Sequence, residues 1–198
     1  IEILAGMEDV NAVPHMIAAL KDDDSEVREK AATALGTFDN EEAIDPLISL
    51  LSDAQGPVRM AAVVTLCAFA PASIAPLIQA LDSSDRDHPR RAALALVSIG
   101  DAAVEPLIEA LNGQNVAVRR GAAHILGQVR DRRAIPALIL ALDDEDRTVR
   151  REAIHALACV GLPAVKPLAL IFKEGDPIGR MSAMEALWMI GSPAVGPV

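Results

Sequence analysis

The stretch Ala103–Val129, AVEPLIEALNGQNVAVRRGAAHILGQV, decides the fold of this 198-residue chain. Its apolar residues recur three and four positions apart on both sides of the polar segment Asn112–Asn115, the pattern of two amphipathic helices joined by a turn. A closely similar sequence occurs six times, at intervals of 30–31 residues. A fixed period in this range is the sequence signature of a solenoid. The sequence therefore predicts an all-α fold, a right-handed α-α superhelix of two-helix repeats.

The repeats are expected to form one solenoid domain, residues 1–198. Full repeats are predicted at residues 9–40, 41–70, 71–100, 101–130, 131–161 and 162–191. Residues 1–8 match the end of a second helix, and residues 192–198 match the start of a further first helix. Repeat arrays usually carry polar capping units at their ends, and no such unit is recognisable here. We therefore expect a piece of a longer array, or ends that associate end to end or meet other chains.

The first helix of each repeat carries one apolar stripe with the spacing i, i+3, i+4, i+7 of a buried helix face. The six stripes are Val13/Met16/Ile17/Leu20, Ile44/Leu47/Ile48/Leu51, Ile74/Leu77/Ile78/Leu81, Val104/Leu107/Ile108/Leu111, Ile135/Leu138/Ile139/Leu142 and Val165/Leu168/Ala169/Phe172. The second helices are expected to begin after residues that suit an N-cap. These are Asp24, Asp85, Asn115, Asp146 and Asp176, with Gln55 as a weaker substitute.

The string Val-Arg-x-x-Ala-Ala-x-x-Leu-Gly, present at Val27–Gly36 and Val118–Gly127, resembles the HEAT-like repeats of the phycobilisome-lyase (PBS lyase) family. The resemblance covers essentially the whole chain. It implies an armadillo/HEAT-type α-solenoid whose second helices line the concave surface. That family includes scaffolds, bilin lyases and a metal-dependent hydroxylase, so the resemblance indicates the fold more closely than the function.

Composition and charge narrow the classes of function. A net charge of −10 disfavours general nucleic-acid binding, which needs a basic surface. No run of eighteen apolar residues is present, so no membrane span is expected. Cys67 and Cys159 lie three repeats apart, too far for a disulfide if the helix pairs stack regularly. Reduced thiols and a cytoplasmic location are the expectation.

The arginine of the Val-Arg motif lies on the buried arc of the second helix, at its first turn. It occurs as Arg28, Arg59, Arg119, Arg150 and Arg180. A buried guanidinium needs partners, and carboxylates of the turns, such as Asp22, Asp53, Asp144 and Glu174, are the expected ones. A structural ladder is therefore the favoured interpretation over an anion-binding role. Pro89 replaces the arginine in the third repeat, so the turn Asp82–Pro89 is expected to be irregular.

One exposed stripe of the second helices differs from repeat to repeat, as expected of a recognition surface. The positions of this stripe are found by rotating about 100° around the helix axis for each residue after the motif arginine. The candidate partner-binding residues on it are Met60, Val64, Arg90, Arg91, Leu94, Arg120, His124, Gln128, Arg151, His155 and Glu185. We expect the partner to be a protein or peptide segment, acidic or amphipathic, with apolar residues on Met60 and Val64 and carboxylates on the arginines. Ordinary solvated side chains, or nucleic-acid contacts along Arg90–Arg151, are the alternatives.

Trp188 occupies the position that holds Gly36 and Gly127 in other repeats. Packing in the core or at the end of the array is the expectation, and an exposed anchor for a partner is the alternative.

No catalytic residues and no cofactor are predicted. His124, Glu152, His155 and Cys159 could converge as metal ligands, but their spacing matches no known metal motif, so no metal is expected. The hydroxylase of the resembled family holds iron with adjacent His-Glu pairs, and this chain has no His-Glu dipeptide. The sequence favours a non-catalytic scaffold that binds a partner segment. The alternative is a bilin-lyase-like or chaperone-like subunit acting on a chromophore protein.

Overall fold

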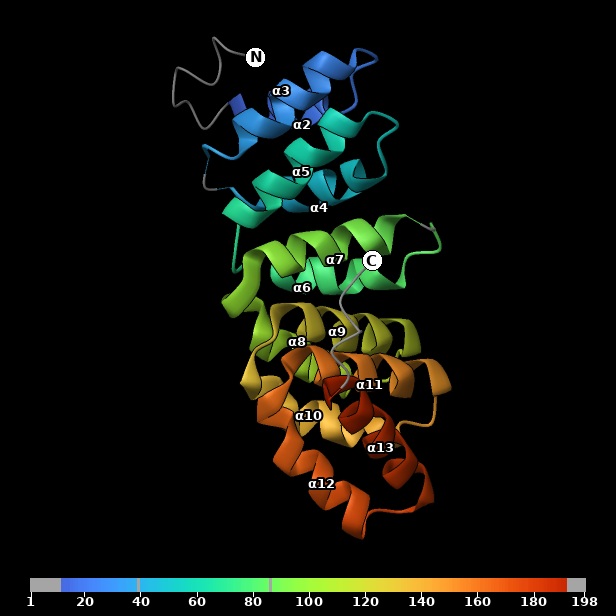
Figure 1. Ribbon diagram of the computed structural model, residues 1–198. Coiled ribbons are helices and arrows are strands. Elements are labelled where there is room, and N and C mark those ends of the chain that lie inside the picture. Colours follow the sequence, from blue (N-terminus) through green and yellow to red (C-terminus); the bar gives the residue numbers. More distant parts are fainter. Residues whose placement is uncertain (1–11, 39, 86, 192–198) are drawn as a thin grey trace. The chain divides into compact units, whose positions relative to one another are not determined.

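The computed structural model describes residues 12–38, 40–85 and 87–191, and these residues form helix pairs without strands (Figure 1). The partial repeats expected at residues 1–8 and 192–198 lie outside the described residues. The first helices are α2 (Val13–Ala19), α4 (Ile44–Ser49), α6 (Ile74–Gln79), α8 (Val104–Leu111), α10 (Ile135–Leu140) and α12 (Val165–Glu174). The second helices are α3 (Ser25–Leu35), α5 (Gly56–Ala68), α7 (His88–Ile99), α9 (Val116–Val129), α11 (Arg147–Val160) and α13 (Pro177–Gly191). The all-α prediction is confirmed.

Short 3₁₀ turns flank most of the first helices. They are η2 (Glu41–Ala43), η3 (Leu50–Ser52), η4 (Ala80–Asp82), η5 (Gly100–Ala103), η6 (Arg132–Ala134), η7 (Ala141–Asp143) and η8 (Leu162–Ala164). Turns of this kind commonly begin and end α-helices, because they satisfy backbone groups that the α-helix leaves free.

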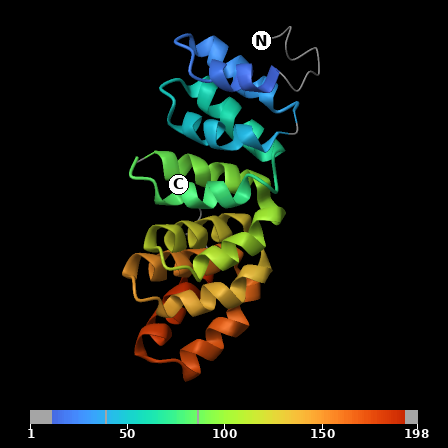
Figure 2. The same cartoon turned by 180° about the vertical axis from the view of Figure 1, so that it is seen from behind.

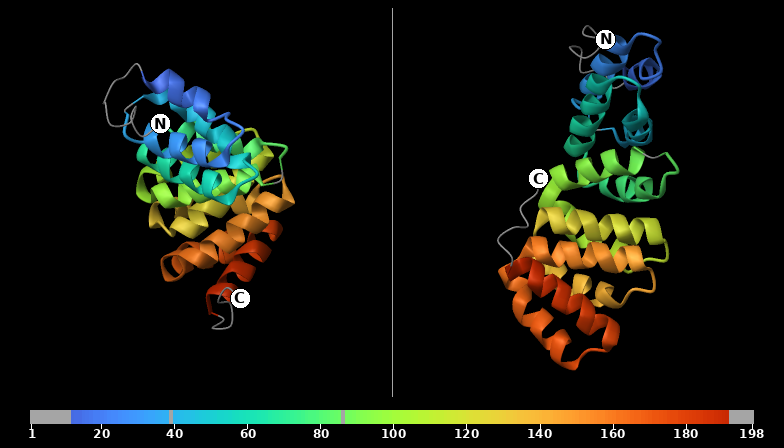
Figure 3. Two further views of the ribbon diagram at one scale, coloured as in Figure 1. Left: turned by 90° about the horizontal axis from the view of Figure 1, so that it is seen from above. Right: turned by 45° about the vertical axis from the view of Figure 1, so that its right-hand side comes forward.

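The chain divides into two compact units, Ile1–Ala102 and Ala103–Val198, although the sequence predicts one continuous domain. Each unit contains three described helix pairs. In the first unit α3 packs on α5 and α5 on α7, and in the second α9 packs on α11 and α11 on α13. The second helices of a unit thus form one layer (Figures 1 and 3), and the first helices form the other, which is seen from behind in Figure 2.

The apolar stripes of the first helices fill the space between the layers. In the first five repeats the residues at i, i+3 and i+7 are buried, and the residue at i+4 is half-buried. The sixth repeat departs from the prediction: Leu168 is buried, but Ala169 and Phe172 are exposed. The equivalent residue of the fifth repeat, Leu142, is buried. It lies in η7, which packs against α13 of the next helix pair as well as against α11. Burial at this position therefore depends on the following pair as well as on the local pattern.

The N-cap prediction is confirmed at most turns. The side chains of Asp24, Asn115 and Asp146 accept hydrogen bonds from backbone N–H groups two residues further on, and Asp176 accepts one from Gly179. The prediction for Asp85 was wrong. The irregular turn delays α7, whose N-cap is Asp87, while Asp85 accepts a hydrogen bond of 2.6 Å from Ser52 Oγ of the preceding repeat.

The motif arginines close the turns that precede their own helices. Arg59 Nη1 donates to the carbonyl oxygens of Asp53 and Ala54, at 2.7 and 2.8 Å. Arg28, Arg119 and Arg150 make the same pair of bonds in their own turns. These bonds satisfy carbonyl groups that the ends of the first helices leave without partners.

Two of these arginines also bind a carboxylate of the following repeat. The guanidinium of Arg28 donates two hydrogen bonds to the Asp53 carboxylate, Nε to Oδ2 at 2.7 Å and Nη2 to Oδ1 at 3.1 Å. Arg119 donates the same two bonds to Asp144, Nε to Oδ2 at 2.8 Å and Nη2 to Oδ1 at 2.9 Å. In both cases the aspartate stands 25 residues after the arginine, whereas Arg59 and Arg150 have Ser84 and Gly175 there. Hydrogen bonding from Arg28 lowers the pKa of Asp53.

The ladder is incomplete at two repeats. Arg180 was expected on the buried arc with Glu174 as a partner, but its side chain is exposed and makes no hydrogen bond to the described residues. In the third repeat, where Pro89 replaces the arginine, Arg91 Nη1 donates to the carbonyl oxygen of Leu51 at 2.7 Å. Arg91 also pairs with Asp87 at 3.2 Å.

No single described helix is both long and apolar enough to cross a membrane. The pair α11 and α12 meets the length and composition criteria only when the two helices are joined across a 115° bend.

The bonds between Arg119 and Asp144 are expected to stabilise the second unit beyond the closure of one turn. Arg119→Met should lower the free energy of unfolding by about 1–3 kcal/mol more than Arg150→Met, because it leaves the Asp144 carboxylate without its cation. Arg150 is the matched control, since it closes its own turn without a carboxylate partner. Urea unfolding of both variants measures the difference, and equal losses would contradict the interpretation.

Candidate partner-binding surface

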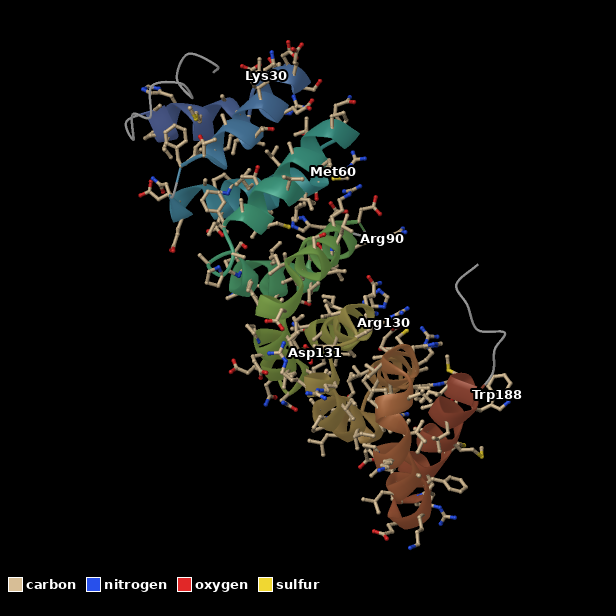
Figure 4. All side chains as sticks on the ribbon, turned by 60° about the vertical axis from the view of Figure 1, so that its left-hand side comes forward. Lys30, Met60, Arg90, Arg130, Asp131 and Trp188 are labelled. Carbon is tan, nitrogen blue, oxygen red and sulfur yellow. The ribbon has the colours of Figure 1, made fainter. Side chains whose placement is uncertain are left out.

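Most of the candidate partner-binding residues are exposed on the second helices. The exposed members are Met60, Val64, Arg90, Leu94, Arg120, His124, Gln128, Arg151, His155 and Glu185. Arg91 is half-buried and holds Leu51 and Asp87, so its guanidinium is largely committed within the protein. Within the first unit, the labelled residues Lys30, Met60 and Arg90 follow one another along the same side (Figure 4).

The first unit carries an apolar patch, which we define as Met60 and Val64 on α5 and Leu94 on α7. These side chains are 56%, 62% and 48% exposed. A pocket of about 460 Å³ adjoins the patch and is lined by Gly56, Pro57, Arg59, Met60, Val63, Arg91 and Leu94. Small and apolar side chains thus form most of the pocket. The guanidiniums of Arg59 and Arg91, which also line it, are bonded to turn carbonyls and to Asp87.

The second unit carries a polar pocket between α9 and α11, which we call the histidine pocket. Its volume is about 450 Å³, and it is lined by His124, Gly127, Gln128, Arg151, Glu152, His155, Ala156 and Cys159, so polar side chains surround a largely apolar lining. Gly127 and Ala156, both small, form what we call its floor. A Cβ atom on Gly127 would lie 2.7 Å from Ala156 Cα, so α9 and α11 approach closely there and larger side chains rise around the floor.

His124 is held from two sides. Its Nδ1 lies 3.3 Å from Glu152 Oε2, and its Nε2 lies 2.8 Å from Gln128 Nε2. The hydrogen bond with His124 is the largest cause that lowers the pKa of Glu152, and the charges of His124, His155 and Arg151 act in the same direction. Glu152 is therefore held in its ionised form. Its contribution to stability is present above the ordinary glutamate pKa and is lost as the pH falls through the lowered value.

The four residues considered as metal ligands line this one pocket, but they do not form a metal site. Among residues 12–38, 40–85 and 87–191, no group of three or more His, Cys, Asp or Glu side chains is placed to hold a metal ion. Cys67 and Cys159 are both free thiols. Burial raises the pKa of the Cys67 thiol, so this sulfur is held as the neutral thiol.

Some residues that line the two pockets were not among the candidates from the sequence. Pro57, Val63 and Ala156 line the pockets but do not belong to the exposed stripe of candidate residues. The signal that could have found the floor of the histidine pocket is the pairing of Gly127 with an alanine 29 residues later. Two small residues at facing positions permit close approach of helices and leave a hollow above them.

Trp188 is not packed in a core. Its side chain is 68% exposed on α13 (Figure 4), and the neighbouring Met181 and Met184 are exposed as well. The structurally equivalent Gly127 instead touches the next second helix. The expectation of core packing for Trp188 is therefore wrong for the described residues.

The interaction between His124 and Glu152 makes a measurable prediction. His124→Ala should raise the pKa of Glu152, because it removes the hydrogen bond that favours the carboxylate. His155→Ala should raise it less, since His155 acts only through its charge. Titration of the Glu152 side-chain carboxyl by ¹³C NMR measures both shifts. An unchanged pKa in His124→Ala, or a larger change in His155→Ala, would contradict this structure of the pocket.

Comparisons with known proteins show similarity at three levels. Bilin biosynthesis protein PecE from Mastigocladus laminosus is 44% identical over 62 residues, a match that covers 30% of this chain and 23% of PecE. Human deoxyhypusine hydroxylase is 24% identical, with 94% of this chain and 76% of that chain covered and a TM-score of 0.45. The archaeal HEAT-like repeats protein from Thermococcus onnurineus NA1 is 16% identical, with 94% and 90% covered and a TM-score of 0.43.

The family model for HEAT repeats matches residues 1–67, 46–112, 74–158 and 104–188, which together span nearly the whole chain. The matches overlap from one helix pair to the next, as expected of a tandem array, and the helix pairs of both units follow them. The chain belongs to the family of HEAT-repeat proteins.

Proposed function

We propose that this HEAT-repeat chain is a non-catalytic scaffold that binds a segment of a partner protein on the surface formed by its second helices. The observation that carries the proposal is the apolar patch of Met60, Val64 and Leu94 on the first unit. Three large apolar side chains, each about half exposed or more, occur together at positions where most other repeats place polar residues. Clusters of this kind on a polar surface mark interaction sites.

The partner segment is expected to be amphipathic and acidic. The pocket beside the patch is lined mainly by small and apolar side chains, so it suits an apolar side chain. Arg90 is exposed on the adjoining helix. Arginine pairs with carboxylates through its planar fork, so acidic residues next to the apolar anchor would find partners here.

Substitutions on the patch test the proposal. Val64→Asp and Met60→Asp should weaken binding of the cellular partner at least tenfold, because a carboxylate replaces an apolar contact and repels an acidic segment. The partner is identified by cross-linking and mass spectrometry with the wild-type protein, and its affinity is then measured for each variant. Leu140→Asp is the matched control: Leu140 is 70% exposed but lies on a first helix. Equal binding by all variants would reject the proposal.

The match to PecE favours a second candidate, a bilin-lyase-like or chaperone-like subunit that acts on a chromophore protein. The similarity is confined to 62 residues, about a quarter of PecE, so it supports the candidate through part of the chain only. The test is incubation of the purified chain with a bilin, a phycobiliprotein subunit and a companion lyase subunit. Bilin attachment that requires this chain would favour the second candidate, and attachment at the same rate without it would reject it.

A further inference from the structure

We propose that the histidine pocket of the second unit is a binding site for a carboxylate, namely an acidic side chain of the partner segment. This inference rests on the proposed function, and it assigns a distinct ligand chemistry to a second place on the surface. The guanidinium of Arg151 and the imidazole of His155 would contact the ligand. His124 would not contact it; as a positioning residue, it would act through Glu152.

The pocket contains one carboxylate, and that carboxylate is already engaged. Glu152 Oε2 lies 3.3 Å from His124 Nδ1, and Glu152 Oε1 lies 4.0 Å from Arg151 Nη2. Glu152 is half-buried, whereas His124, His155 and Arg151 are exposed. A cationic ligand would have to compete with His124 for Oε2 and with Arg151 for Oε1 of Glu152. An anionic ligand meets donors whose hydrogen-bonding capacity is not used.

The donors remain available because the helices place them around a hollow. Arg151 and His155 lie one turn apart on α11, so both project over the same side of that helix. Arg151 makes its one ion pair at the 4.0 Å limit, and no hydrogen bond joins His155 to any of the described residues. Arg120 lies one turn before His124 on α9 and is exposed. The small floor of Gly127 and Ala156 leaves room for a carboxylate between these groups.

His124 makes the pocket more acceptable to an anion. Its Nδ1 lies 3.3 Å from Glu152 Oε2, so this carboxylate oxygen is occupied and is not presented to a second carboxylate. The amide of Gln128 lies 2.8 Å from the other ring nitrogen and fixes the orientation of the ring. The other charged groups of this surface are Arg120 on α9 and Glu185 on α13, the latter one repeat beyond His155. The charged groups named around the pocket are thus two arginines and two carboxylates, and one of the carboxylates, Glu152, is held by His124.

The test uses N-acetylated, C-amidated tetraglutamate, which carries carboxylates and no apolar side chain. The full chain is labelled at its four histidines and titrated at pH 7 in about 0.15 M salt, where the Debye length of roughly 8 Å screens the distant negative charge. The imidazole signals of His155 and His124 should shift in a saturable way. Those of His15 and His88, which lie in the first unit, should stay in place and serve as internal references. The corresponding tetralysine peptide should produce no shift at His155.

Matched variants define the roles of the residues. Arg151→Gln should weaken tetraglutamate binding roughly tenfold, the equivalent of about 1.4 kcal/mol. Arg147→Gln removes the same charge from the same helix outside the pocket, so it should change the affinity less than twofold. His124→Ala should weaken binding, and the additional substitution Glu152→Gln should restore it. A merely structural role of His124 would not be rescued in this way.

The inference fails if tetraglutamate leaves His155 unshifted, if tetralysine shifts it, or if Arg147→Gln weakens binding as much as Arg151→Gln. It also fails if Glu152→Gln does not restore binding in the His124→Ala background. None of these outcomes touches the apolar patch, because the probe has no apolar side chain. Failure of the proposed function is seen separately, as unchanged partner affinity in Met60→Asp and Val64→Asp.

Discussion

The close packing of small side chains between successive second helices is the constraint on which each unit depends. Ala122, Ala123, Ala153 and Ala156 are buried where α9 meets α11, and Gly127 brings the two backbones nearer still. A single helix pair has too little apolar surface to be stable alone, so each pair must bury its face on the next. The near absence of aromatic residues follows from this, because large rings would force the second helices apart. Close, regular packing also fixes where the exposed stripe projects.

The motif arginines show how a charged group can be buried in the turns of these repeats. Each guanidinium that is held in a turn bonds to carbonyl groups at the end of a first helix, so desolvation is offset by hydrogen bonds that the backbone needs in any case. A carboxylate partner is added only where aspartate stands 25 residues further on, as in Arg28–Asp53 and Arg119–Asp144. At the corresponding positions of the third and fourth repeats the sequence has Pro89 and Gln114, which can form no such pair.

The features that sequence analysis predicted correctly are those that local spacing determines. The buried positions of the first helices and the caps at Asp24, Asn115 and Asp146 depend on residues a few places apart. The errors occurred where a neighbouring repeat decides the outcome. Phe172 and Trp188 are exposed because no described helix pair covers them, and Arg91 is committed because the carbonyl of Leu51, forty residues earlier, lies within its reach. The floor of the histidine pocket likewise depends on contact between two repeats.

The candidate surface differs in chemistry between the two units while the scaffold beneath it stays the same. Val64 and His155 occupy the same position of their second helices, and both are exposed. Exchange of such residues changes little in the core, because the buried arc of the helix is made of other positions. Selection on binding can therefore act on the exposed stripe almost independently of selection on stability. Under the proposed function, the apolar patch of the first unit and the histidine pocket of the second unit each favour a different side-chain chemistry in what they bind.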